Sequence, residues 1–189
     1  MSTPTTPSRP ARIQGPDRDG LSPETVELLD LAALASGHTP ATIEALAHQP
    51  ALLSPFLGWA AALALKGTLP LRDHELLALR VAWNCRSAFE WDEHVGYARS
   101  AGMADAEIEA IKLGSADPRW SPGEAALLDA ADQLGRDCAI SEETWGRLSA
   151  HYDSAALVET IFIVGQYTML SMVANGLGIP ADVAGTADR

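Results

Sequence analysis

A glutamate and a histidine four residues apart, Glu90 and His94, are the clearest pair of chemical groups in the sequence. On a helix, residues with this spacing lie one turn apart on the same face. A carboxylate beside an imidazole can hold and transfer a proton, because the carboxylate favours the charged ring and orients its N–H group. The pair is therefore a candidate for acid and base catalysis, and the alternative is an ordinary half-buried histidine.

A third ionisable group, Glu75, lies in the apolar segment 71–83. An ionised carboxylate is costly in such surroundings unless it has a partner. One interpretation is a structural ion pair with Arg80 or Arg86, and the other is a functional carboxylate that acts together with His94.

Two helices are expected to position these groups. Apolar residues at positions 76, 77, 79, 81 and 83 predict a buried helix, and residues 89–95 open a second one. We expect the break between them, at residues 84–87, to lie at the mouth of a cavity lined by the three ionisable groups. In that cavity an arginine could hold a substrate carboxylate, and the tryptophans could form walls or belong to the core. We predict catalytic roles for Glu75, Glu90 and His94, and substrate contacts for Arg80, Trp83, Cys85, Arg86, Ser87 and Trp91.

The segment 75–94 resembles the carboxymuconolactone decarboxylase / alkyl hydroperoxidase D-like family. In the peroxidase branch of this family, a Cys-x-x-Cys motif precedes the histidine by four residues, and a glutamate lies twelve residues before the first cysteine. Counting back from His94 places the cysteine positions at Glu90 and Ser87 and the early glutamate at Glu75, so both cysteines are absent. The decarboxylase branch instead has a glutamate four residues before the histidine, often as Glu-Trp-x-x-His, and residues 90–94 match that pattern.

The resemblance extends over roughly residues 50–181, through Ala101-Gly102-Met103, Gln166-Tyr167 and the segment 175–180. It implies an all-α, alkyl hydroperoxidase D-like bundle of about eight or nine helices. It also implies a homo-oligomer, with a trimer, a hexamer and a dimer as the alternatives.

The first functional hypothesis is a cofactor-independent acid/base enzyme that acts on a small carboxylate or carbonyl compound. Decarboxylation or isomerisation passes through an enolate, which His94 could protonate while Glu90 and Glu75 set its protonation state. The second is a thiol peroxidase that uses Cys85, for which Cys138 would be the other thiol. The third is a non-catalytic scaffold or ligand binder.

No metal or cofactor is expected from the motifs. Glu90 and His94 supply two ligands on one face, and His74-Glu75 lacks the second histidine of a zinc helix of the His-Glu-x-x-His type. No Walker loop or dinucleotide-binding glycine pattern is present.

Composition narrows the cellular setting. A formal net charge of −12 argues against nucleic acid and anionic membranes as partners, because both are negatively charged. The partner expected instead is a small molecule. Two cysteines do not form a disulfide framework, and the first ten residues lack a secretory h-region, so a cytoplasmic protein is expected. The apolar run 51–65 is too short to cross a bilayer.

Prolines, serines and glycines that typically begin or end helices predict where each helix lies in the chain. We expect a flexible arm over residues 1–20, a helical domain over 21–181 and a tail over 182–189. Ser22-Pro23 begins the first helix, which should run to Ser36 and close at Gly37. Further helices are predicted from Pro40 to near His48, from Ser54-Pro55 to Gly67, and over 105–113, 121–137, 141–152 and 154–175.

Overall fold

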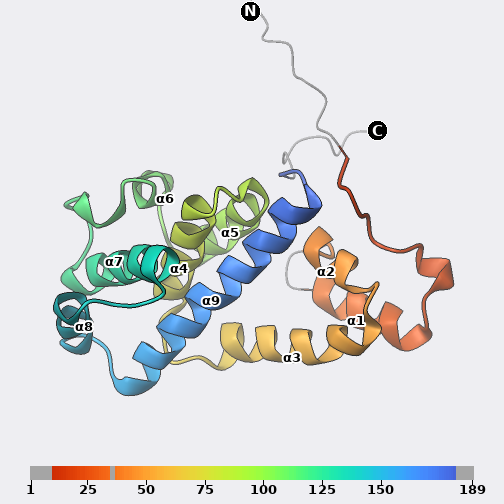
Figure 1. Ribbon diagram of the computed structural model, residues 1–189, viewed down its shortest axis with the longest axis horizontal. Coiled ribbons are helices and arrows are strands. Elements are labelled where there is room, and N and C mark those ends of the chain that lie inside the picture. Colours follow the sequence, from red (N-terminus) through yellow and green to blue (C-terminus); the bar gives the residue numbers. More distant parts are fainter. Residues whose placement is uncertain (1–9, 35–36, 182–189) are drawn as a thin grey trace, which may run out of the picture.

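The computed structural model describes residues 10–34 and 37–181. Within these ranges the chain forms nine α-helices, two short 3-10 turns and no β-strand, which confirms the all-α prediction. The helices, shown in Figure 1, are α1 Pro23–Ala33, α2 Ala41–Leu46, α3 Pro50–Lys66, α4 Leu71–Asn84, α5 Ala88–Ser100, α6 Asp105–Ile111, α7 Pro122–Asp137, α8 Glu142–Ser149 and α9 Ser154–Leu177. Residues 1–9 of the predicted arm and the predicted tail 182–189 lie outside the described residues.

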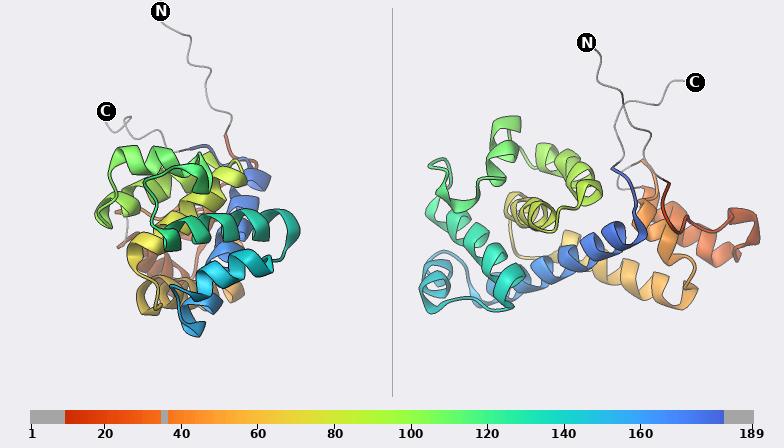
Figure 2. Two further views of the ribbon diagram at one scale, coloured as in Figure 1. Left: turned by 90° about the vertical axis from the view of Figure 1, so that its left-hand side faces the viewer. Right: turned by 45° about the horizontal axis from the view of Figure 1, so that its top comes forward.

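The long helix α9 joins two groups of helices. Helices α4 to α8 lie along one part of α9, and α1 to α3 gather along the other part (Figure 1). The right-hand view in Figure 2 shows the same separation, with α8 and α1 at opposite ends of the molecule. Helix α4 is central to the larger group, because it packs against α5, α7 and α9.

Because α4 is surrounded, its residues 73–82 are all buried, including four that can carry a charge. Buried polar groups are costly unless they are hydrogen-bonded, and each of these four has a partner on another helix or loop. The pairs are Asp73 with Tyr152, His74 with Tyr167, Glu75 with His94, and Arg80 with Asp132.

Helices α1 to α3 share a small core of their own, built from Leu29, Ile43, Ala47 and Leu53. The predicted start of α3 at Ser54-Pro55 is wrong, because the helix begins at Pro50 and contains Pro55. Pro50 fits the first helical position, where a missing N–H costs nothing. Pro55 lies in the second turn, so it removes only one backbone hydrogen bond, and that bond is close to the start of the helix.

The last part of the predicted arm packs on the protein. The backbone N–H of Arg12 donates to the carbonyl of Leu177 at 2.6 Å, and the guanidinium of Arg18 lies 2.6 Å from Asp30. Helix α1 ends at Ala33, earlier than predicted, and Gly37 follows with a positive φ of 82°. The predicted last residue, Ser36, lies outside the described residues.

Helix α9 is long and apolar enough, by length and composition, to cross a membrane. Half of its most apolar window is buried inside the protein, as in the core helix of a globular fold.

Candidate functional site

Glu75 on α4 and His94 on α5 form a buried hydrogen bond. The Nδ1–H of His94 donates to Oε2 of Glu75 at 2.7 Å. On its other side, Nε2 of His94 lies 3.9 Å from Oε2 of Glu90, one turn earlier on α5. Both ring nitrogens therefore face a carboxylate, and the structure brings together the three residues for which the sequence predicted catalytic roles.

The start of α5 fixes the direction of Glu90. Ser87 is the N-cap residue of this helix, and its buried hydroxyl accepts a hydrogen bond from the backbone N–H of Glu90 at 3.4 Å. Such a cap satisfies one of the free N–H groups of the first turn. Glu90 and His94 then emerge from the same face toward α4 and α9.

Two aromatic residues complete the surroundings of the histidine. The edge of the Tyr167 ring packs against the ring of His94, with the ring centroids 4.5 Å apart. The Tyr167 hydroxyl is hydrogen-bonded to Nε2 of His74 at 2.8 Å. Burial lowers the pKa of His74 and raises that of Tyr167, so both are neutral near neutral pH. The sequence predicts no role for either residue, although Gln166-Tyr167 is part of the family resemblance.

The protonation states of His94 and Glu90 are set by burial and by their neighbours. For His94, burial disfavours the charged ring, but the hydrogen bond and the charge of Glu75 outweigh it and raise the pKa. For Glu90, burial raises the carboxyl pKa to about 7, and the charge of His94 opposes this shift. The His94 ring therefore holds a proton more readily than a free imidazole, and it lies beside a carboxyl group that exists both with and without its proton near pH 7.

These groups line a half-open cavity of about 470 Å³ between α2, α3, α4, α5 and α9. We call it the glutamate–histidine cavity, because its polar wall contains His74, Glu75, Glu90, Glu93, His94, Tyr97, Gln166 and Tyr167. The remaining wall is mostly apolar and includes Pro40, Ile43, Phe56, Ala60, Ala64, Leu65, Leu71, Phe89 and Leu170. Its size and apolar lining are typical of a small-molecule site.

Four residues for which substrate contacts were predicted lie elsewhere. Trp83, Arg86, Ser87 and Trp91 line a separate cavity of about 630 Å³ that contains none of the three candidate catalytic groups. The helical repeat explains this separation, because Trp91 projects about 100° away from Glu90 around the axis of α5 and Ala88 lies farther round still. The break between α4 and α5 opens into this second cavity.

Arg80 is a structural residue. Its guanidinium binds both oxygens of Asp132, at 2.6 and 2.7 Å, and also the backbone carbonyl of Ile111 at 2.8 Å. It lines neither cavity. The predicted substrate contact of Arg80 is therefore not supported by its position, and its partner is Asp132 instead of Glu75.

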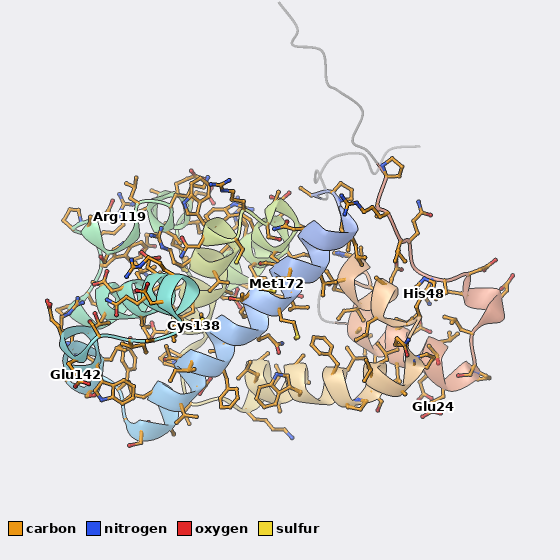
Figure 3. The ribbon with its side chains drawn as sticks, in the orientation of Figure 1. Glu24, His48, Arg119, Cys138, Glu142 and Met172 are labelled. Atoms are coloured by element: carbon orange, nitrogen blue, oxygen red, sulfur yellow. The ribbon has the colours of Figure 1, made fainter. Side chains whose placement is uncertain are left out.

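Cys85 is also away from the cavities. Burial raises the pKa of its thiol, although the nearby hydroxyl groups of Ser171 and Thr168 on α9 oppose this shift. Cys138, labelled in Figure 3, is exposed at the end of α7, and both cysteines are free. A protonated thiol is a poor nucleophile, so the surroundings of Cys85 do not favour thiol chemistry.

The comparison with protein families agrees with this geometry. Residues 50–133, which contain all three candidate catalytic groups, match the model of the carboxymuconolactone decarboxylase family. Over this segment the chain is similar to that family. The match to the carboxymuconolactone decarboxylase model ends within α7, so Tyr167 and Gln166 lie beyond it.

Solved structures support the fold over nearly the whole chain. A peroxidase-related protein from Silicibacter sp. TM1040 has a TM-score of 0.82 and 18% identity, with 96% of each chain covered. A peroxidase-related protein from Ralstonia eutropha JMP134, with an alkylhydroperoxidase AhpD core, has a TM-score of 0.81 and 17% identity over 95% of each chain. The debrominase Bmp8 in complex with 2,3,4-tribromopyrrole has a TM-score of 0.79 and 14% identity, covering 96% of this chain and 95% of its own. No curated protein matches the sequence.

Proposed function

We propose that the protein is a cofactor-independent acid/base enzyme that moves a proton next to the carbonyl group of a small molecule. The observation that carries this proposal is the position of His94, whose two ring nitrogens face Glu75 and Glu90 at the wall of a cavity. Isomerisation and related lyase chemistry both need such a proton transfer.

Each group has a distinct task in the proposed reaction. The ionised carboxylate of Glu90 takes a proton from the carbon beside the carbonyl, which leaves an enolate. The imidazolium of His94 stabilises the enolate and returns a proton to it, while Glu75 keeps the ring oriented and charged. The pKa of Glu90, about 7, suits this task, because a catalytic base is most effective when its pKa lies near the working pH.

A substrate screen tests this assignment. Turnover of ketones and unsaturated lactones is measured for the wild-type protein, His94→Ala and Glu90→Gln. We expect both variants to lose at least about a hundredfold in kcat/KM, in line with the usual contribution of a general acid or base. Equal turnover by all three proteins would remove the assignment.

The alternative is a thiol peroxidase that uses Cys85. It is favoured by two of the structural neighbours, which are named peroxidase-related proteins. The raised pKa of the half-buried Cys85 thiol and the glutamate at position 90 oppose it, because peroxide reduction needs a thiolate and then a second thiol. Peroxide consumption that is lost in Cys85→Ser would support this alternative.

We also propose that the protein forms a homo-oligomer through α3. Of the 17 residues of this apolar helix, only Leu53 is buried. Exposed side chains include Leu52, Trp59 and Leu65, and Trp59 packs edge-on against Phe162 of α9 with ring centroids 5.4 Å apart. Apolar surface of this kind is typical of subunit contacts.

Light scattering after size-exclusion chromatography tests the self-association. Leu52→Glu should shift the protein toward the monomer, because it places a charge on the proposed contact. Leu113→Glu is the matched control, because Leu113 is also exposed but lies after α6, away from α3. A monomeric wild-type protein would exclude the oligomer.

A further inference from the structure

We infer that the substrate of the glutamate–histidine cavity has an uncharged polar head and an apolar tail that reaches between α2, α3 and α9. The inference rests on the proposed function, which places a carbonyl group beside Glu90 and His94. It adds the charge of the head and the position of the tail.

The charged residues of the cavity exclude an anionic head. Among its described lining residues are three glutamates, Glu75, Glu90 and Glu93, and no lysine or arginine. The positive charge of His94 is already balanced by Glu75 at 2.7 Å. A substrate carboxylate would therefore lose water and meet Glu90 and Glu93 without a free cation, which is unfavourable. This argues against the carboxylate half of the hypothesis drawn from the sequence.

Glu93 has a partner of its own, which keeps it in place at the cavity. Its carboxylate lies 2.9 Å from Nε2 of His38, in the segment before α2. The side chain of Glu93 is only 10% exposed, so its charge is weakly screened by water. The contact also ties the α1–α2 connection to α5 beside the cavity.

A third cavity, apolar and of about 340 Å³, adjoins the glutamate–histidine cavity. We call it the tail cavity, because the inferred tail of the substrate would lie in it. It shares four lining residues with the glutamate–histidine cavity, namely Thr42, Ile43, Phe56 and Leu170. Its other lining residues are Ala45 and Leu46 of α2 and Met169, Met172, Val173, Gly176 and Leu177 of α9. Met172, labelled in Figure 3, marks its position along α9.

No charged residue lines the tail cavity, and its only polar side chain among the described residues is Thr42. Apolar surface of this kind is stabilised by contact with hydrocarbon rather than water. Methionines adapt their shape to a bound chain more readily than branched residues do. A ligand whose head lies at Glu90 and His94 can therefore extend an alkyl or aryl tail along α9.

Binding of small ketone and carboxylate probes, measured by isothermal titration calorimetry at pH 8, tests the inference. The probes are 2-octanone, 2-butanone and octanoate, which separate the length of the tail from the charge of the head. We expect 2-octanone to bind at least tenfold more tightly than either of the other two. No binding of 2-octanone, or octanoate binding as tightly as 2-octanone, would overturn the inference.

Two matched variants locate the tail. Val173→Phe narrows the tail cavity. It should weaken the binding of 2-octanone at least fivefold and leave the affinity for 2-butanone unchanged. Val158→Phe is the control, because it makes the same change on an exposed part of α9 and should alter neither affinity. Ala45→Leu narrows the cavity from α2 and should repeat the effect of Val173→Phe. Unchanged 2-octanone binding in both cavity variants, or an equal loss for both ketones, would place the tail elsewhere.

One further variant separates this inference from the proposed function. His94→Ala should keep its affinity for 2-octanone within about threefold, because the tail contributes most of the binding, while it loses turnover. Normal turnover with intact probe binding would contradict only the proposed function. Lost turnover in His94→Ala, with no preference for the longer ketone in the wild-type protein, would contradict only the inference.

Discussion

Glu75 and His94 are 19 residues apart in the sequence, yet their side chains share a 2.7 Å hydrogen bond between α4 and α5. Glu90, one helical turn from His94, is farther away at 3.9 Å. The buried acid on α4 is therefore the stronger partner of the histidine, and Glu90 remains available to a bound molecule.

Removal of the Glu75 charge should lower the pKa of His94. Burial alone disfavours the imidazolium, and the hydrogen bond and charge of Glu75 outweigh it in the wild-type protein. An NMR titration of the His94 ring in Glu75→Gln should therefore show a pKa below that of the wild type. An unchanged value would mean that Glu75 does not control the ring.

The same pair makes stability depend on pH. Because folding raises the pKa of His94, the pair contributes stability that is complete below the unfolded value of about 6.5 and is lost as the pH rises through the folded value. Glu75→Gln should therefore destabilise the protein more at pH 6 than at pH 9, measured by urea unfolding. A loss that is equal at both pH values would show that the contact is not ionic.

Glu90→Gln should stabilise the protein at pH 8 while it abolishes activity. Folding raises the carboxyl pKa of Glu90 from 4.5 to about 7, so the buried acid weakens the fold as the pH rises through that window. The neutral amide avoids this cost, which is about 3 kcal/mol at pH 8. The gain should shrink at pH 5, where Glu90 is mostly protonated in the folded protein. Destabilisation at pH 8 would contradict the raised pKa.

Arg80→Ala should destabilise the protein by about 3 kcal/mol, because Asp132 loses its charged partner, although it keeps the Asn84 amide as a donor, and two backbone carbonyls lose the guanidinium. Arg99→Ala is the control, since Arg99 pairs with Asp105 at 2.8 Å on the exposed surface. Its effect should stay within about 0.5 kcal/mol. Thermal unfolding of the two variants measures the difference. Similar losses of stability would mean that the buried ion pair contributes no more to folding than the exposed one.

Gly67→Ala should destabilise the link between α3 and α4. The carboxylate of Glu159 accepts hydrogen bonds from the Thr68 hydroxyl at 2.9 Å and from the Leu69 backbone N–H at 3.1 Å. A Cβ at position 67 would lie 1.9 Å from the other oxygen of that carboxylate, so the contact must break or shift. Gly58→Ala, in open space on α3, should instead stabilise the helix by up to about 1 kcal/mol. If Gly67→Ala and Gly58→Ala both shift the unfolding curve in the same direction from the wild type, this account is contradicted.

The sequence was sufficient for the helical pair that carries the site. The apolar repeat predicted α4 and α5, and the spacing of Glu90 and His94 placed both on one face. By the same repeat, Trp91 points about 100° away from Glu90 around the helix axis, toward a different face. Chain proximity at the α4–α5 break is therefore a poor guide to which cavity a side chain lines.

The spacing of residues in the sequence could not predict which side chains pair between different helices. Whether Glu75 binds His94 or Arg80 depends on how α4 packs against α5 and α7, and no local pattern contains that information. His74 and Tyr167 meet for the same reason, since α9 returns to α4 after 93 residues. The pair Ser54-Pro55 has the pattern of a helix start, whereas Pro50 holds the first helical position of α3.

Exchange of α-protons for deuterium tests the central claim most directly. A panel of ketones and lactones in D2O at pH 7 is followed by NMR with the wild-type protein, His94→Ala and Cys85→Ser. The account predicts exchange with the wild type and with Cys85→Ser at similar rates, and at least a hundredfold less with His94→Ala. Equal exchange by the wild type and His94→Ala, or exchange that disappears in Cys85→Ser, would contradict it.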